Sequence, residues 1–264
     1  MTKGKSFPEQ VQSTFTRTSL HLEVRSNQQT LSVATGFIIT AWDDAKYLVT
    51  NWHVLAGRDA ETGACLSSSG AIPDEVRVYH HSLADINRRE PRIERLYHDP
   101  DNTTPRWLEH PRGRAIDVVL LPLTDVQPPV AIAPFSTAWA DTGILELPGL
   151  QVAVIGFPYG LHVAQRWPIW KTGHIASDPG FAYDDKPSFL IDITTRQGMS
   201  GSPIVYQSPG PFFIGEGEKG INARMKAQFL GVYSGRIHKD SEIGRGWPPE
   251  VIRDIVQAHR IPLP

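Results

Sequence analysis

The feature that most constrains the fold is a succession of short stretches in which apolar and polar residues alternate, separated by turn-forming residues. Alternation with a period of two is typical of β-strands that bury one face. In the first half of the chain, residues 19–25 and 75–80 alternate in this way, and residues 31–40 and 46–50 are also interpreted as strands. In the second half, apolar stretches follow at residues 151–155, 169–176, 190–194, 203–206 and 228–233. Many short strands at fairly even spacing predict an all-β, barrel-like architecture.

The segments between the strands divide the chain into two halves. Residues 127–150 are rich in Pro, Ala and Gly and are interpreted as a connection. We therefore expect a first barrel over residues 1–128, a linker over 129–150 and a second barrel over 151–264. Residues 82–111 are interpreted mainly as exposed loop with one strand near 92–97, and residues 210–226 as a mixed loop.

The end of the chain differs in kind from the rest. After a Pro-Pro-Glu start at residues 248–250, an apolar stripe recurs at helical spacing, formed by Val251, Ile252, Ile255 and Val256. A proline pair at the start and one apolar face predict a short C-terminal α-helix. We expect this helix to pack on the second barrel rather than to bind a partner.

Charge and cysteine content narrow the class of protein. A net charge of −2 over 264 residues gives no electrostatic reason to expect nucleic acid or an anionic membrane as partner. Cys65 is the only cysteine, so an intrachain disulfide is excluded, which favours a reducing compartment. The N-terminal residues lack the apolar core of a secretory signal, and no run of about 18 apolar residues is present. We expect a cytoplasmic protein without metal or other cofactor.

One serine lies in a glycine-bearing turn between two predicted strands, at residues 196–203. Gly198 allows the backbone to turn so that amide groups point one way. The N–H groups of Gly198 and Ser200 would then form a pocket for a developing oxyanion. The alternative is an ordinary loop. A serine is a poor nucleophile alone, so the catalytic interpretation requires a histidine base and an orienting acid elsewhere.

A histidine and an aspartate meet this requirement. His53 follows a predicted buried strand and precedes an apolar turn, which would hold it rigidly, as a general base needs. Asp117 lies in an apolar, β-forming run, where a buried acid is costly unless it is hydrogen-bonded, for example to an imidazole Nδ1–H. The alternatives are a core histidine and an aspartate that caps a backbone N–H. Other acids, each in a turn, are Asp99, Asp101 and Asp125.

The order of these residues along the chain discriminates between hydrolase folds. A nucleophile elbow of the α/β-hydrolase type needs a glycine two residues after the serine, a helix next, and the histidine later in the chain. Here that position is Ser202, a strand-like run follows, and His53 comes first. The α/β-hydrolase interpretation is therefore excluded.

At these residues the chain resembles the trypsin-like (chymotrypsin-fold) serine peptidases, in particular the bacterial branch with the HtrA-type and glutamyl endopeptidases. The matching motifs occur in the family's order at residues 34–39, 49–54, 116–121 and 198–203. The resemblance implies two six-stranded antiparallel β-barrels, with His53 and Asp117 on the first and Ser200 on the second. It also implies a serine endopeptidase that hydrolyses peptide bonds of a protein or peptide substrate through a Ser-His-Asp triad and an acyl-enzyme.

Two departures from the family pattern affect regulation. Met199 stands where secreted digestive members carry an aspartate that receives a newly cut N-terminal ammonium. Methionine cannot form that ion pair, so activation by propeptide cleavage is not expected. HtrA relatives add a PDZ domain after the barrels, and this sequence ends too early for one.

The resemblance also locates a specificity pocket. Its walls would be Thr194, Thr195 and the strand residues Tyr233, Ser234 and Gly235, with Arg236 near the rim. Tyr233 stands where glutamyl endopeptidases have a histidine that holds an acidic side chain. Because no Asp or Glu is expected at the pocket floor, we expect a polar, acidic or small substrate side chain rather than a basic one.

Two other functions remain open from the sequence. One is a catalytically silent trypsin-like fold that acts as a binding or scaffold module. The other is an esterase-like or self-processing activity, which uses the same acyl chemistry. A regulatory protein partner is also left open.

Overall fold

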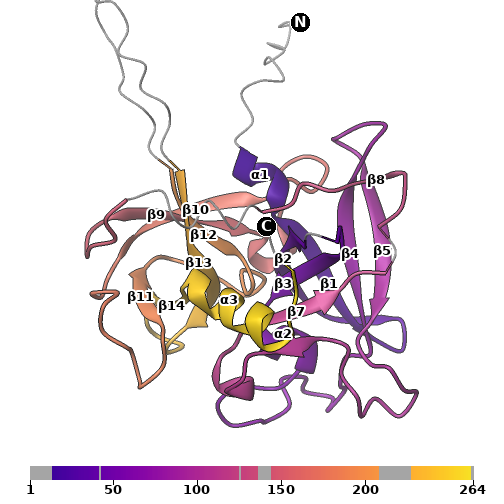
Figure 1. Cartoon of the computed structure of the whole chain (residues 1–264), viewed down its shortest axis with the longest axis horizontal. Coiled ribbons are helices and arrows are strands. Elements are labelled where there is room, and N and C mark those ends of the chain that lie inside the picture. The colour runs from indigo at the N-terminus through magenta and orange to yellow at the C-terminus, as the bar shows by residue number, and fades with distance from the viewer. Residues whose placement is uncertain (1–13, 42, 125, 136–143, 208–226, 263–264) are drawn as a thin grey trace, which may run out of the picture.

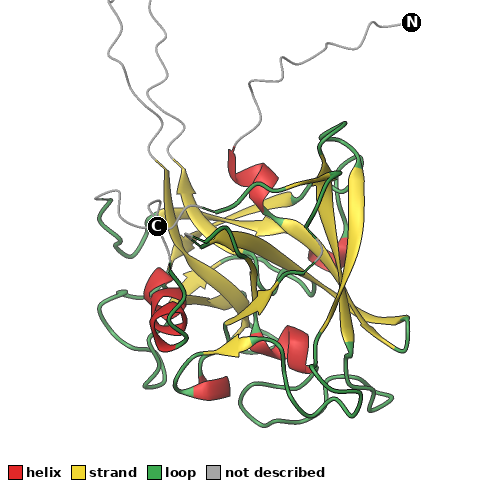
Figure 2. Ribbon diagram, turned by 45° about the vertical axis from the view of Figure 1, so that its right-hand side comes forward, coloured by secondary structure: helices red, strands yellow, loops and turns green. Residues whose placement is uncertain are grey.

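A computed structural model of the chain describes residues 14–41, 43–124, 126–135, 144–207 and 227–262. Strands dominate these residues, and the helices are short (Figures 1 and 2). The predicted all-β class, with a chymotrypsin-like arrangement and one C-terminal helix, is confirmed. No helix among the described residues is both long enough and apolar enough to cross a membrane.

The first half forms one antiparallel sheet with the strand order β5-β4-β1-β2-β3-β7-β6, and β8 pairs with β4. This sheet has eight strands rather than the six expected. Its elements are α1 Thr14–Thr18, β1 Leu20–Ser26, β2 Gln29–Thr40, β3 Lys46–Thr50, α2 Trp52–Ala56, β4 Glu75–Ser82, β5 Arg89–Arg95, β6 Leu108–Glu109, the 3-10 helix Gly113–Ala115, β7 Val119–Pro122 and β8 Val130–Ala131. Strand β8 lies within the segment that we expected to be linker.

The second half forms a closed six-stranded barrel with the order β10-β11-β14-β13-β12-β9. Its elements are β9 Gln151–Gly156, the 3-10 helix Pro158–Gly160, β10 Ile169–Ile175, β11 Phe189–Asp192, β12 Pro203–Gln207, β13 Ala227–Arg236, β14 Ile243–Trp247 and α3 Pro249–Ala258. The loop predicted at residues 210–226 lies outside the described residues, as does the N-terminal region up to residue 13.

Three apolar clusters form the core, and one of them joins the two halves. Leu22, Leu48 and Val78 belong to the cluster inside the first sheet, and Val154 and Leu230 to the cluster inside the barrel. Full burial of each such side chain stabilises the fold by roughly 1.5–3 kcal/mol. The third cluster lies between the halves and includes residues of both sheets and of α3. The two halves therefore share a core at their boundary, where the cleft described below also lies.

Helix α3 spans this boundary rather than packing on the second barrel alone. Its apolar stripe, Val251, Ile252, Ile255 and Val256, belongs to the shared cluster, and the helix contacts both β13 and β7 (Figure 1). His110 of the first half also lies 3.1 Å from the Asp254 carboxylate on the helix. The expectation that α3 packs against the barrel is thus correct but incomplete.

Strand β14 was not predicted, because its sequence Ile-Gly-Arg-Gly-Trp shows neither an apolar run nor a β-branched one. Its two glycines are required by close packing inside the barrel. A Cβ atom at Gly244 would lie 2.5 Å from the ring of Tyr233, and one at Gly246 would lie 2.6 Å from the ring of Phe189. Tertiary packing therefore makes a strand from residues with low β-propensity.

Candidate active site

A cavity of about 1080 Å³ lies between the two halves and is lined by residues from both. His53 reaches it from α2 of the first half, and Ser200 reaches it from the loop before β12 of the second. Asp117 also lines the cavity. The structure therefore brings together the three residues that the sequence singled out, although 147 positions separate His53 from Ser200.

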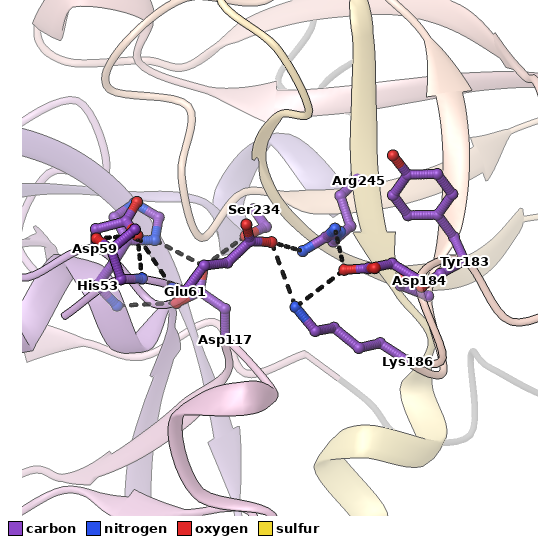
Figure 3. Close-up of polar contacts among 11 residues, drawn as sticks. His53, Asp59, Glu61, Asp117, Tyr183, Asp184, Lys186, Ser234 and Arg245 are labelled. Carbon is purple, nitrogen blue, oxygen red and sulfur yellow. Dashed lines mark hydrogen bonds and ion pairs between the residues drawn. The ribbon is translucent and has the colours of Figure 1, made fainter.

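His53 uses both carboxylate oxygens of Asp117 (Figure 3). Its Nδ1 lies 2.7 Å from Asp117 Oδ2, and its backbone N–H donates to Oδ1 at 2.9 Å. The N–H groups in the first turn of a helix have no partner within the helix, so this one is available to the carboxylate. The contact at Nδ1 favours the tautomer with the proton on Nδ1, which leaves Nε2 as an acceptor.

Helix α2 and the segment before β7 differ from the sequence expectation. His53 lies within a short helix, α2, rather than at the end of a strand before an apolar turn. Asp117 precedes β7 rather than lying within a strand, because the 3-10 helix before it and a tight turn at Ile116 interrupt the extended backbone. Only 4% of Asp117 is exposed. An irregular backbone here directs the carboxylate toward His53.

Two further residues hold Asp117 in place. The side-chain amide of Asn51 donates to the backbone carbonyl of Asp117 at 2.6 Å, and the Ser234 hydroxyl donates to Oδ2. Ser234 was expected to form a pocket wall. The structure places it in the cavity lining, as expected, and also gives it this contact with the acid. Asn51 lies two residues before His53, within the motif at residues 49–54, but nothing in that pattern shows that it contacts Asp117.

Ser200 lies within reach of the free imidazole nitrogen. Its Oγ is 3.0 Å from His53 Nε2 and 3.1 Å from the carbonyl oxygen of Ser234. The hydroxyl has one proton and can donate it to only one of these acceptors at a time. The arrangement therefore allows proton transfer from Ser200 to His53 without movement of the chain.

The charge environment of His53 favours its protonated form. Burial by itself lowers the pKa of an imidazole, but the charge and hydrogen bond of Asp117 and the charge of Asp59 outweigh burial and raise the pKa of His53. Asp59 follows α2, and a hydrogen bond from the Thr62 N–H is the largest factor that lowers its own pKa. The charges of two carboxylates thus act on one imidazole.

The backbone around Ser200 presents two amide groups to the cavity. The Tyr159 N–H donates to the carbonyl of Gln197, and the Ser202 N–H donates to that of Met199. Because C=O and N–H point in opposite directions in a trans peptide, the N–H groups of Gly198 and Ser200 point away from those donors. Among the described residues, neither N–H has an acceptor within the protein. Both residues line the cavity.

Gly198 cannot be replaced at this turn. Its φ is +93°, in the region that favours glycine, and a Cβ atom would lie 2.2 Å from the carbonyl oxygen of Phe157. The sequence argument that this glycine permits the turn is supported by its geometry.

Thr35 of β2 anchors this turn from the other half of the molecule. Its N–H donates to the Ser200 carbonyl at 2.9 Å, and its hydroxyl donates to the Gly198 carbonyl at 2.8 Å. The same hydroxyl accepts the N–H of Phe157 at 3.2 Å. Thr35 is fully buried. Although it lies within a motif noted in the sequence, nothing in the pattern shows that it contacts a turn more than 160 residues away.

The residues expected to form a specificity pocket are only partly together. Thr195, Tyr233, Gly235 and Arg236 line the cavity, whereas Thr194 is exposed and lies outside its lining. The hydroxyls of Tyr233 and Thr195 form a hydrogen bond to each other. Burial raises the pKa of Tyr233 to about 12, so its phenol stays neutral and keeps its proton.

The alternative acids do not occupy the position of Asp117. Asp99 accepts N–H groups of Thr103 and Thr104 within its own loop, and Asp101 is exposed. Asp125 lies outside the described residues. Among the described candidates, Asp117 is the carboxylate that contacts the ring of His53.

Replacing Thr35 by valine tests the anchor between the halves. Thr35→Val keeps the shape but removes a buried hydroxyl with two partners, so the free energy of unfolding should fall by about 1–3 kcal/mol. Thr40→Val on the same strand is the matched control, because the Thr40 hydroxyl is buried and has no hydrogen-bond partner in the part of the chain that the structure describes, so its removal should be neutral or stabilising. Urea denaturation measures both, and equal losses would contradict the anchoring role of Thr35.

Comparisons with known proteins agree with the fold of this chain. Residues 34–210 match the family model of the trypsin-like peptidase domain. Similar solved structures include the HtrA-type protease AlgW with tripeptide (TM-score 0.54, 16% identity, covering 93% of this chain and 62% of that chain). A second is the protease Anisep from Arthrobacter nicotinovorans (TM-score 0.52, 14% identity, covering 92% of this chain and 94% of that chain). A third is the active form of the Rv3671c protease from M. tuberculosis (TM-score 0.51, 17% identity, covering 92% of this chain and 81% of that chain).

Identities this low show a common fold and no more, and a search of curated proteins finds no match. The family model covers more than half of the chain, from the β2 motif through the turn that carries Ser200. The chain therefore belongs to the family of trypsin-like peptidases.

Proposed function

We propose that the protein is a serine endopeptidase that cuts peptide bonds through Ser200, His53 and Asp117. The observation that carries the proposal is the unbroken series of contacts from the Asp117 carboxylate through the imidazole of His53 to the hydroxyl of Ser200, inside a cavity open to substrate. A core histidine and a capping aspartate, the structural alternatives, would have no reason to meet a serine in a cleft.

In the proposed reaction, Ser200 Oγ attacks the peptide carbonyl while His53 Nε2 takes the hydroxyl proton. The carbonyl oxygen becomes an oxyanion, and the N–H groups of Gly198 and Ser200 would stabilise it. Asp117 stabilises the imidazolium that forms. His53 then gives its proton to the leaving amine as the C–N bond breaks, which leaves an acyl-enzyme on Ser200. Water, deprotonated by His53, hydrolyses the ester and restores the serine.

The proposal includes a site that forms without cleavage of a propeptide. Met199 is fully buried among apolar side chains of the barrel, including Ile193 and Ile204. Its position offers no carboxylate for a new N-terminal ammonium, so apolar packing supports the turn instead. The hydrogen bonds of Thr35 supply further support from the first half.

The pocket chemistry supports a preference against basic side chains at the cleavage position. The acids that line the described cavity are Asp59, Glu61 and Asp117, all of them from the first half. None of the three forms a hydrogen bond with the neutral Tyr233–Thr195 pair, and Glu242, whose charge acts on Tyr233, is paired with Arg196. The pair therefore provides hydroxyl groups for a polar, acidic or small substrate side chain.

Profiling with a proteome-derived peptide library tests the proposed function. Wild type should cut at defined sites read by mass spectrometry, and Ser200→Ala should lose at least about a thousandfold in rate because the nucleophile is gone. Ser202→Ala is the matched control. Its hydroxyl is buried, has no hydrogen-bond partner among the residues that the structure describes and lies outside the cavity lining, so cleavage should persist. Cleavage that survives in Ser200→Ala would overturn the proposal, and a wild type that cuts nothing would favour the silent scaffold.

The pH dependence of cleavage follows from the raised pKa of His53. The imidazole must be neutral to accept a proton, so kcat/KM should rise with pH through an apparent pKa above 6.5. Asp117→Asn should move that pKa down and lower kcat by about three to four orders of magnitude. Asp59→Asn should produce a smaller downward shift with kcat near wild type at high pH. Identical profiles for wild type and Asp117→Asn would contradict the assignment.

A further inference from the structure

The cleft is basic although the chain is not. Its lining has three acidic residues, Asp59, Glu61 and Asp117, and twice as many basic ones, which are Arg114, Lys186, Arg196, Arg236, Lys239 and Arg245. The whole chain has a net charge of −2. Charge of one sign along a cleft raises the local concentration of molecules of opposite charge. An acidic peptide would therefore be attracted to this cavity.

Two of the basic residues form a defined site with carboxylates. Lys186 Nζ lies 3.3 Å and Arg245 Nη1 lies 3.1 Å from the same oxygen of Glu61 (Figure 3). Both cations also approach Asp184, at 3.4 Å and 3.8 Å. Glu61 follows α2 in the first half, whereas Lys186 and Arg245 belong to the second. The Glu61 carboxylate of the first half thus forms ion pairs with two cations of the second half, across the cleft.

The cations and the acids differ in burial. The side chains of Lys186 and Arg245 are only 17% and 14% exposed, whereas those of Glu61 and Asp184 are 57% and 58% exposed. The guanidinium of Arg245 also lies 5.3 Å from the ring centre of Tyr183. The cations are held by the protein, and the acids that neutralise them are accessible to solvent. A substrate carboxylate that took the place of Glu61 beside Lys186 and Arg245 would therefore bury no additional charge.

This pair of cations is separate from the Tyr233–Thr195 pocket. Cβ atoms at Gly244 and Gly246 would point at Tyr233 and at Phe189, inside the barrel. Side chains alternate along a strand, so Arg245 points out of the barrel, toward the first half. The two sites would consequently contact different side chains of one extended peptide.

We infer that Lys186 and Arg245 form a carboxylate-binding subsite for an acidic side chain of the substrate, at a position other than the residue whose carbonyl is attacked. Glu61 occupies this subsite in the free protein, and the substrate carboxylate displaces it. The inference rests on the proposed peptidase function, because it assigns the substrate class of that same cleft. The remaining basic residues of the lining draw an acidic segment toward it.

Cleavage kinetics give the first test. In the peptide library, wild type should select Asp or Glu at a position other than the one before the cut bond. In the best-cleaved peptide, replacing that residue by its neutral amide should lower kcat/KM about tenfold or more. Lys186→Met and Arg245→Met should abolish this difference between the two peptides, and Glu61→Gln should raise kcat/KM for the acidic peptide by removing the competing carboxylate.

Arg253→Met is the matched control, because it removes one positive charge from α3, where Arg253 pairs with Glu250 outside the cavity lining. It should leave the preference for the acidic peptide unchanged. A wild type without acidic selection, or a Lys186→Met variant that keeps the full preference, would overturn the inference.

Binding to the inactive variant separates this inference from the proposed function. Fluorescence anisotropy measures the affinity of Ser200→Ala for two fluorescein-labelled octapeptides. One peptide alternates glycine and glutamate, and the other alternates glycine and glutamine. The glutamate peptide should bind at least about tenfold more tightly, and Lys186→Met in this background should reduce that ratio severalfold, whereas Arg253→Met should leave it unchanged. That result supports the subsite even if wild type cuts no peptide, in which case only the peptidase function fails. Equal binding of both peptides overturns the subsite whatever the cleavage data show.

Discussion

A single buried carboxylate organises the cleft. Asp117 is almost fully buried, and an ionised group there is tolerated only if its oxygens are hydrogen-bonded. His53 supplies two of those contacts, one from its ring and one from its backbone, and Ser234 supplies another. The requirement to satisfy Asp117 therefore fixes the orientation and tautomer of the imidazole. It also ties β13 of the second half to an acid of the first.

The site exists only when the two halves are packed together. Thr35 in the first half holds the carbonyls of Gly198 and Ser200, so the turn with the exposed amide groups depends on a strand from the other sheet. Helix α3 and the shared apolar cluster bury the boundary on which this alignment depends. Glu61 adds ion pairs across the cleft. Core packing, backbone hydrogen bonds and charge thus reinforce one relative placement of the halves.

The sequence predicted the features that depend on local pattern. Alternation and short apolar runs identified most strands, and the contexts of His53, Asp117 and Ser200 identified three residues that the structure brings into contact. Local pattern failed where tertiary contact decides the structure. Strand β14 has glycines because the Tyr233 and Phe189 rings leave no room for a side chain.

The long-range partners of the site were also beyond the reach of sequence pattern. Thr35 and Asn51 are ordinary polar residues in the sequence, and only the folded chain shows which carbonyls they hold. Glu61 and Lys186 are 125 positions apart, so no spacing rule could pair them. The carboxylate of Asp117 depends on an irregular backbone in a stretch whose composition favours a strand. Each of these features is set by contacts between residues far apart in the sequence or by local backbone geometry that composition does not show.

The most direct measurement is labelling of the native protein by a fluorophosphonate, which reacts with a serine only when a neighbouring base activates it. Peptide mapping by mass spectrometry should place the adduct on Ser200 alone. Labelling should disappear in Ser200→Ala and in His53→Ala and be unaffected in Ser202→Ala. An unlabelled native protein, or a label that persists when His53 is removed, would contradict the account of an imidazole that joins buried acid and serine hydroxyl in one cleft.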